Sequence, residues 1–419
     1  MPRILWMSPF SLHDTSSGAA VNCRHMLKSL YDRGFEVWAC SSFIFDAKNG
    51  AQAFGDLKKL LDEDDHDVFA FDEDGIHYVY TRTDGTDEAD MTLMECQLFY
   101  RTFCSCLSSF KPDVVIGFGN SPLAMNCFAE ARSRSISTAY MLSNGTWSTY
   151  LFPNIDLILT DSYANARLYA ERDEINTVPV GAFFDLQSIV AAEHQRRFVT
   201  MVNPSDYKGV SIFARLAEIC RKRMPEVQFL TVNTHERFTE VVTRLHTKGN
   251  PAEHPYHQDD FPNVFMVEQQ VDMRSIYAIS SVMLVPSLWF EAWGRTASEA
   301  VFNNIPVIAA NTGGLAEAIA GGGVLLETPE HCREDYMSLP DDEEMEPWLN
   351  ALEVLLRENF DAELEAARAR LSQESAVNRL IEALQPLIER TTAARNPGNS
   401  MVSSLNALSN DELTDISFE

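Results

Sequence analysis

Short apolar runs alternate with segments of helical periodicity from the N-terminus to about residue 340. In the first half, apolar runs predict strands at 4–7, 35–40, 76–81, 113–118, 137–142, 156–160 and 176–180. Apolar residues recur every three or four positions near 18–33, 92–110, 122–132 and 163–171, which predicts helices there. Strands that alternate with helices, without tight hairpins, are typical of a parallel sheet covered by helices on both faces.

The same alternation then starts again. Strands are predicted at 197–202, 227–232, 263–267, 282–285, 306–309 and 324–327, with helices between them. We therefore expect a Rossmann-like first domain at 1–185, a linker at 186–196 and a second Rossmann-like domain at 197–340. Helices are expected at 341–390, and the segment 391–419, rich in Ser, Asn, Thr and acidic residues, is expected to be a flexible tail.

Charge narrows the range of partners. The chain has 33 Lys and Arg residues against 61 Asp and Glu residues, a net charge of −28. Such a chain repels phosphate backbones and anionic lipid headgroups, so we expect neither nucleic-acid binding nor docking on a membrane. No apolar run is long enough for a transmembrane segment, the N-terminal residues reach a polar loop before an apolar run of signal-peptide length develops, and the 8 cysteines include no CxxC pair. We expect a cytoplasmic protein with reduced thiols.

The segment 286–300 carries the clearest chemistry. Glu291 lies in the loop that follows a predicted strand, and Gly294 allows the backbone to approach a ligand closely just before a helix opens. The free N–H groups of that helix favour a phosphate, and Glu299 in its early turns can reach a hydroxyl. Two carboxylates around a phosphate site suit a sugar–diphosphate–nucleoside. Alternatively, the two glutamates only stabilise the helix N-terminus.

Lys208 is the candidate cation for that phosphate. It lies between a predicted strand and a predicted helix, and ligands of doubly wound sheets bind beyond the carboxyl ends of the strands. A solvated lysine in a surface loop is the alternative. A second glycine segment before a helix, at 311–317, follows the next strand and strengthens the case for a ligand site.

These segments resemble a known family. Glu291 and Glu299 separated by seven residues, followed by the segments 305–309 and 312–317, are similar to retaining GT-B glycosyltransferases of family 4, the glycosyl transferases group 1. Weaker similarity extends to 17–20, 161–162, 178–185 and 202–209. The resemblance implies an α/β fold of GT-B type: two Rossmann-like doubly wound parallel-sheet domains facing each other across a cleft, with C-terminal helices. The first domain would hold the acceptor and the second the nucleotide-sugar donor.

The resemblance also implies roles for individual residues. Glu291 would hold hydroxyls of the transferred sugar and Lys208 would pair with the diphosphate, which makes these two the candidate catalytic residues. Glu299 would bind the ribose. The other donor contacts that the resemblance implies are Gly18, Val267, Gly294, Arg295 and Thr296.

Three departures from the family pattern stand out. Asn203 and Pro204 occupy the place where an arginine is common, and Arg295 is a candidate replacement for that missing cation. The first domain lacks the usual histidine after strand 113–118, which leaves Asn120, Ser121 and Asn144 as candidate contacts for the sugar or the acceptor. Ser17 stands where the first loop usually has a second glycine.

The function we expect is transfer of a sugar from a nucleoside diphosphate sugar to an acceptor hydroxyl, with retention of configuration and without a metal or other cofactor. A UDP-sugar is favoured over a GDP-sugar, and the acceptor would be a soluble saccharide, a metabolite or a protein side chain. The alternatives are a nucleotide-sugar epimerase or hydrolase on the same fold, and a non-catalytic nucleotide-sugar-binding subunit. Acidic runs at 62–67 and 72–74 have spacings that Mg²⁺ could use, but solvated charges explain them better. The sequence does not indicate an oligomeric state.

Overall fold

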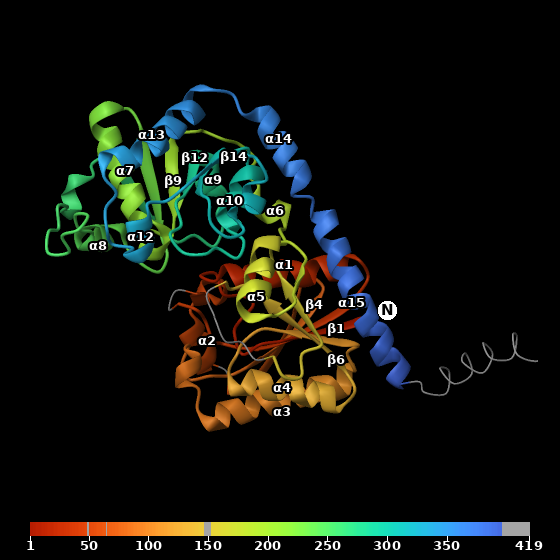
Figure 1. The fold of residues 1–419 in the computed structure, drawn as a ribbon. Helices are drawn as coiled ribbons and strands as arrows, with labels where there is room; N and C mark the ends of the chain where they lie inside the picture. The colour runs from red at the N-terminus through yellow and green to blue at the C-terminus, as the bar shows by residue number, and fades with distance from the viewer. Residues whose placement is uncertain (48–49, 64, 146–151, 396–419) are drawn as a thin grey trace, which may run out of the picture.

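A computed structural model describes residues 1–47, 50–63, 65–145 and 152–395. The chain forms two α/β domains, each built on its own sheet, joined by the segment around residues 180–197 (Figure 1). Most of the predicted tail, residues 396–419, lies outside the described part. None of the helices in the described ranges is long and apolar enough to cross a membrane.

The first sheet has 8 strands in the order β3-β4-β2-β1-β5-β6-β7-β8. Its neighbouring strands pair in parallel, apart from the antiparallel pair β3–β4. The strands are β1 (Arg3–Met7), β2 (Glu36–Ser42), β3 (Val68–Glu73), β4 (Ile76–Thr81), β5 (Val114–Gly117), β6 (Ser137–Leu142), β7 (Leu157–Thr160) and β8 (Val178–Pro179).

The hairpin β3–β4 corrects the expectation that tight hairpins are missing. Its turn lies at Asp74 and Gly75, which both have positive φ, 51° and 77°. The turn therefore uses part of the acidic run at 72–74, where solvated charges were expected. Sequence reasoning missed β3, because its short apolar run at 68–71 lies between acidic segments and this edge strand is largely exposed.

Two helical layers cover the first sheet, as alternation of side chains along each strand requires. Ile4 and Trp6 face one side, where α1 (Gly18–Asp32) packs. Leu5 and Met7 face the other side, which α3 and α4 cover (Figure 1). The remaining helices of this domain are α2 (Leu57–Glu63), α3 (Leu93–Phe110), α4 (Pro122–Ser133), α5 (Tyr163–Asp173) and the short linker helix α6 (Leu186–Ile189).

The second sheet has 6 strands in the order β11-β10-β9-β12-β13-β14, and all their pairings are parallel. The strands are β9 (Phe198–Val202), β10 (Gln228–Asn233), β11 (Val264–Glu268), β12 (Ser280–Val285), β13 (Val307–Ala310) and β14 (Gly323–Leu326). The helices are α7 (Val210–Arg223), α8 (Phe238–Val241), α9 (Arg274–Ile279), α10 (Arg295–Phe302), α11 (Leu315–Ile319) and α12 (Glu330–Glu334). The predicted fold class, two doubly wound α/β domains, is confirmed.

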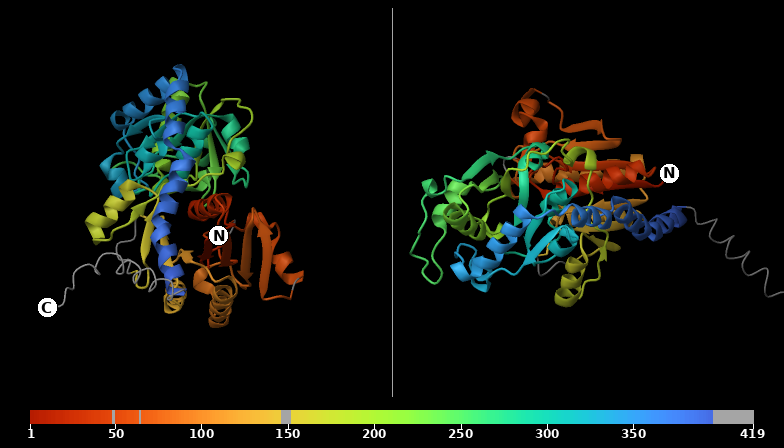
Figure 2. Two further views of the ribbon diagram at one scale, coloured as in Figure 1. Left: turned by 90° about the vertical axis from the view of Figure 1, so that its right-hand side faces the viewer. Right: turned by 90° about the horizontal axis from the view of Figure 1, so that it is seen from above.

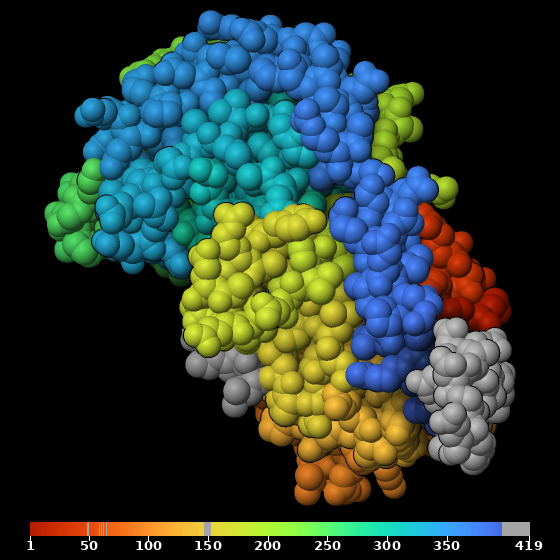
Figure 3. All heavy atoms as spheres, turned by 45° about the vertical axis from the view of Figure 1, so that its right-hand side comes forward, coloured from red at the N-terminus to blue at the C-terminus, as the bar shows by residue number. Residues whose placement is uncertain are grey.

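The C-terminal helices connect the domains a second time. Helices α13 (Asp342–Arg357) and α14 (Asp361–Arg370) pack on the second domain, and α15 (Gln373–Arg395) returns to the first (Figures 1 and 2). In the space-filling view α15 lies directly against the first domain (Figure 3). The Ser137 hydroxyl donates to the carbonyl oxygen of Leu387 at 2.8 Å, and Thr391 is fully buried. The tail boundary expected at 391 is therefore wrong by five residues, because α15 continues through Arg395.

We expect Leu384→Ala to destabilise the protein by about 2–5 kcal/mol, since Leu384 of α15 is fully buried against the first sheet. Urea unfolding measures the change in the free energy of unfolding. Glu382→Ala, an exposed position two residues away, serves as the control and should shift it by less than about 0.5 kcal/mol. Equal effects of the two substitutions would show that α15 does not stabilise the first domain in this way.

Candidate active site

The candidate site lies at the carboxyl ends of the central strands of the second sheet. Loops after β9, β12 and β13 contribute Lys208, Glu291 and Gly313. The first domain contacts this end directly: the carboxylate of Glu317 accepts hydrogen bonds from the backbone N–H groups of Tyr163 and Ala164 at 3.0 and 2.9 Å. The site is thus at the junction of the two domains, where doubly wound sheets bind ligands.

Glu291 and Lys208 form an ion pair. Lys208 Nζ lies 2.6 Å from Glu291 Oε1, and the Ser287 hydroxyl donates to the same oxygen at 2.6 Å. Burial alone would raise the pKa of Glu291, but the adjacent Lys208 ammonium outweighs it and holds that pKa below its ordinary value. Glu291 is therefore an ionised buried carboxylate at neutral pH.

Two aromatic rings shape the environment of Lys208. Its Nζ lies 4.6 Å from the centre of the Trp289 ring and 5.6 Å from that of Tyr207. The Lys208 side chain keeps 22% of its surface exposed, compared with 8% for Glu291. The ammonium is thus held by a carboxylate and two rings but still reaches solvent, so an anion can approach it.

Gly313 and Gly314 allow the loop after β13 to pack on the backbone of Glu291. The Gly314 N–H donates to the carbonyl oxygen of Glu291 at 2.8 Å. Gly313 has a φ of 54°, and a Cβ at this position would lie 2.0 Å from that same oxygen. Any larger residue would displace Glu291, which gives a structural reason for the glycine pair noted in the sequence.

Helix α10 begins beside these residues. Gly294 precedes it with a φ of 99°, and a Cβ there would meet Leu315 Cδ2 at 2.4 Å. Within the described ranges no side chain caps this N-terminus. Its first N–H groups, with half-buried Thr296 among the first residues, therefore have the geometry that favours a phosphate.

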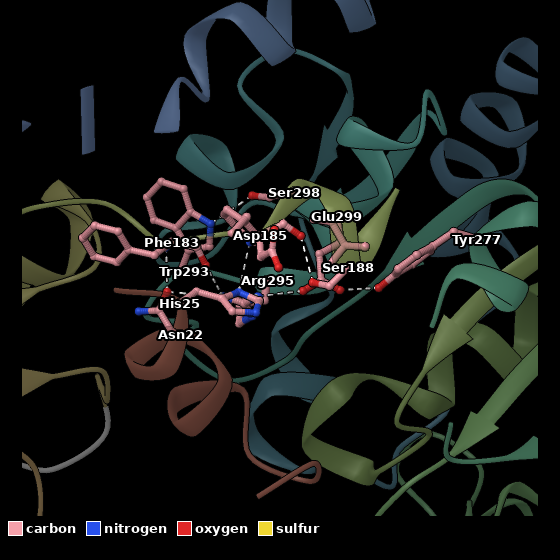
Figure 4. Close-up of polar contacts among 12 residues, drawn as sticks. Asn22, His25, Phe183, Asp185, Ser188, Tyr277, Trp293, Arg295, Ser298 and Glu299 are labelled. Atoms are coloured by element: carbon pink, nitrogen blue, oxygen red, sulfur yellow. Dashed lines mark hydrogen bonds and ion pairs between the residues drawn. The ribbon is translucent and has the colours of Figure 1, made fainter. Parts of the chain in front are cut away.

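Among the described residues, the carboxylate of Glu299 has two hydrogen-bond partners (Figure 4). The hydroxyl of Tyr277 donates to Glu299 Oε2, and Arg295 Nη2 donates to Oε1 at 3.0 Å. Tyr277 is fully buried, and burial together with Glu299 raises the pKa of its hydroxyl, which stays protonated. A carboxylate oxygen can accept two hydrogen bonds, so ribose hydroxyls could still donate to Glu299.

Arg295 points away from the phosphate position. Its Nη1 donates to the carbonyl oxygen of Phe183 at 2.7 Å and to Asn22 Oδ1 at 3.2 Å, both outside the second domain's sheet. Arg295 therefore does not fill the place of the missing cation in this arrangement. Lys208 and Arg295 are each paired with a carboxylate, Glu291 and Glu299, so the start of α10 adds positive potential for a diphosphate beside Lys208.

The other predicted residues are spread more widely. Gly18, at the start of α1, faces the site, because a Cβ there would lie 3.6 Å from Arg295 Cδ. Val267 lies in β11, at the edge of the second sheet. Ser121 caps α4 with its hydroxyl, Asn120 is the exposed residue before it, and the carbonyl oxygen of Asn144 accepts a hydrogen bond from Tyr169. The structure thus brings together Gly18, Lys208, Glu291, Gly294, Arg295, Thr296 and Glu299.

Ser121 also lines a hollow in the first domain. The hollow has a volume of about 460 Å³. Besides Ser121, two phenylalanines, three acidic residues and an alanine line it: Phe10, Phe45, Asp46, Asp87, Glu88 and Ala89. The local sequence contains no signal for this grouping, because its members come from four separate segments.

Sequence reasoning missed the first-domain partners of the site. Asn22 Nδ2 donates to Asp161 Oδ1 at 3.0 Å, and the Asp185 N–H donates to His25 Nδ1 at 3.2 Å. Burial and the adjacent Arg295 lower the pKa of His25 to about 3, so its ring is neutral. Asn22 and His25 are spaced for one face of a helix, but nothing in the sequence links that face to Arg295.

Asp161 should make stability depend on pH. Burial raises its pKa to about 7, although the hydrogen bond from Asn22 lowers it. Because the ordinary value is about 4, the folded state binds more protons than the unfolded state between these pH values. The stability contributed by Asp161 therefore falls as pH rises from about 4 to 7, by on the order of a few kcal/mol.

We expect Asp161→Asn to raise the melting temperature relative to wild type at pH 8, with a smaller gain at pH 5. Thermal unfolding at the two pH values measures this, with the exposed Asp84→Asn as the control. An equal change at both pH values would contradict the raised pKa of Asp161.

No group of three or more His, Cys, Asp or Glu residues in the described ranges could hold a metal ion. In the acidic run at 72–74, Asp72 pairs with His77 at 2.8 Å and Glu73 with His13 at 2.7 Å. Their carboxylates serve the fold of the first domain.

Known protein families and solved structures include proteins similar to this chain. Residues 191–346 match the family model described as glycosyl transferases group 1. No curated protein matches the chain. Solved structures share the fold along most of the chain: a sucrose-phosphate synthase from Thermosynechococcus elongatus is 14% identical, with a TM-score of 0.62 over 93% of this chain and 100% of that one.

Two further structures are similar to the same degree. A glycosyltransferase from Rickettsia africae is 14% identical, with a TM-score of 0.63 over 92% of this chain and 98% of its own. The Anabaena protein HepE, solved in complex with UDP, is 15% identical, with a TM-score of 0.58 over 92% of this chain and 100% of its own. Together with the family match, these structures confirm the predicted GT-B fold.

Proposed function

Because residues 191–346 match the glycosyl transferases group 1 model and the chain has the GT-B fold, we propose that this protein transfers a sugar from a nucleoside diphosphate sugar to an acceptor hydroxyl, with retention of configuration and without a metal ion. The donor would be a UDP-sugar rather than a GDP-sugar. HepE, which shares the fold, binds UDP and UDP-glucose, and this supports the choice.

The observation that carries the proposal is the position of Glu291 and Lys208 beside the start of α10. Their charged atoms are 2.6 Å apart, and Glu291 lies three residues before Gly294, the glycine that precedes the helix. A sugar ring against Glu291 would place its anomeric phosphate near both Lys208 and the N–H groups of Arg295 and Thr296. One end of the donor would thus meet a carboxylate and the other a cation and a helix N-terminus.

The charges of Lys208, Glu291 and the N-terminus of α10 suggest how the sugar would be transferred. When the bond between the anomeric carbon and the phosphate oxygen breaks, negative charge grows on the diphosphate and positive charge on the sugar ring. Lys208 and the N-terminus of α10 would stabilise the first, and Glu291 would stabilise the second without becoming covalently attached. The acceptor hydroxyl would attack the face that the diphosphate leaves and pass its proton to a phosphate oxygen, which retains the configuration.

The acceptor would bind on the side of the first domain. The hollow next to Ser121 combines carboxylates with the rings of Phe10 and Phe45, which suits a soluble acceptor rich in hydroxyl groups. Asn120 and Asn144 remain candidates for the edge of this acceptor site.

The test is a thermal-shift panel of nucleotide sugars, followed by product analysis with a labelled donor. A ligand at 100 times its dissociation constant should add about 2.7 kcal/mol to the free energy of unfolding. Transfer of label to an added saccharide supports the proposal. Released free sugar would indicate a hydrolase, a changed nucleotide sugar an epimerase, and intact donor with clear binding a non-catalytic subunit.

A further inference from the structure

Arg295 contacts residues of both domains (Figure 4). In its own helix it pairs with Glu299 at 3.0 Å. On the other side it donates to the carbonyl oxygen of Phe183 at 2.7 Å and to Asn22 Oδ1 at 3.2 Å, and its guanidinium carbon lies 4.5 Å from the centre of the Phe184 ring. The side chain is only 12% exposed, so nearly all of its contacts are with protein.

These partners occupy positions that must move if the domains move. Phe183 and Phe184 lie in the segment that leads from β8 to β9, and Asn22 lies on α1 of the first domain. Asn22 is itself fixed, because its Oδ1 accepts from the Phe183 N–H at 2.7 Å and its Nδ2 donates to buried Asp161. Arg295 therefore connects α10 both to the interdomain segment at Phe183 and Phe184 and to Asn22 of the first domain.

The Arg295 side chain is also held by its ion pair with the carboxylate of Glu299. The two oxygens of this carboxylate are held by Arg295 and by Tyr277, so a ribose hydroxyl that donates to Glu299 shares an oxygen that already has a partner. A further donor to this carboxylate would weaken its ion pair with Arg295, because the same two oxygens would then serve three donors. Binding of a nucleoside at Glu299 would thus affect the interdomain segment through the side chain of Arg295.

We propose that Arg295 is a positioning residue that couples nucleotide binding at Glu299 to the angle between the two domains. The inference rests on the proposed function, because it assumes that Glu299 meets the nucleoside. By thermodynamic reciprocity, if nucleotide binding changes the contacts of Arg295 with Asn22 and Phe183, then removal of these contacts must change the affinity for the nucleotide. Arg295 would act in this way without touching the reacting atoms.

The test uses UDP, small-angle X-ray scattering and calorimetry on the full chain. In the wild type, UDP should change the radius of gyration. In Arg295→Met, the free protein should already differ from the wild type, UDP should cause no further change, and UDP affinity should fall by about 5-fold or more. Arg295→Lys, which keeps the charge, should restore part of both responses, and Arg223→Met, a surface arginine paired with Glu346, should behave as the wild type.

Asn22→Ala removes the contact of Arg295 with α1 of the first domain and leaves the Arg295–Glu299 pair in place. It should weaken both the domain response and UDP binding, which a purely local role of Arg295 would not predict. The inference is overturned if wild type binds UDP and the Arg295 and Asn22 variants keep its scattering response and affinity. A wild type that binds neither UDP nor UDP-glucose would instead refute the proposed function, and the coupling with it.

Discussion

Glu291→Gln should lower the rate of sugar transfer by about 10²–10³-fold and leave the affinity for UDP nearly unchanged. The substitution keeps the shape of the side chain and the hydrogen bond from Ser287, but it removes the negative charge that would face the sugar ring in the transition state. UDP lacks that sugar, so its binding should hardly depend on the charge. Initial rates with labelled donor, compared with UDP titrations by calorimetry, measure the two effects separately.

Glu330→Gln is the matched control for this prediction. It makes the same chemical change at an exposed position of the second domain and should leave both rate and affinity at wild-type values. Equal losses of rate and UDP affinity in Glu291→Gln would contradict the role assigned to Glu291, because they would place its charge next to the nucleotide instead of the sugar.

Lys208→Ala should destabilise the protein by about 3 kcal/mol and abolish the thermal shift caused by UDP. The buried carboxylate of Glu291 would lose its cation, and the diphosphate would lose the side chain that reaches solvent beside it. Thermal unfolding with and without UDP measures both effects. Lys222→Ala, at an exposed lysine paired with Glu218, is the control and should change neither.

The pH dependence of stability separates the two effects of Lys208→Ala, the loss of stability and the loss of UDP binding. In the wild type, Lys208 keeps the pKa of Glu291 below its ordinary value, so the stability that the pair contributes is present at neutral pH and is lost as the pH falls through that lowered value. Without Lys208, burial should raise the pKa of Glu291, and the variant should become more stable relative to wild type as the pH falls from 7 to 5. Lys208→Met combined with Glu291→Gln should regain stability but not UDP binding. An undiminished UDP shift in Lys208→Ala would remove the lysine from the diphosphate site.

The sequence predicted those parts of the fold that depend on local signals. Apolar periodicity predicts a helix near 92–110, and α3 is observed at Leu93–Phe110, where Thr92 and Glu95 form a capping box at its start. Buried parallel strands such as β12 and β13 were found because both of their faces are covered, which produces continuous apolar runs. The loop with Glu291 could be placed for the same reason, since it directly follows such a strand.

The remainder depends on contacts between distant segments. Nothing near residue 384 shows that α15 packs on the first sheet rather than on the second domain, which precedes it in the chain. The direction of Arg295 follows from Phe183 and Asn22, which are 112 and 273 residues away. Tyr277 of α9 donates to Glu299 of α10, 22 residues further along the chain, and a single tyrosine carries no signal of that contact in the sequence.

The most direct test of the account is a crystal structure of the protein with UDP-glucose. We predict the diphosphate between Lys208 Nζ and the first N–H groups of α10, with phosphate oxygens within about 3 Å of both, and the glucose against Glu291. A nucleotide sugar bound elsewhere, with the Lys208–Glu291 pair unchanged at 2.6 Å and no phosphate at the start of α10, would contradict it.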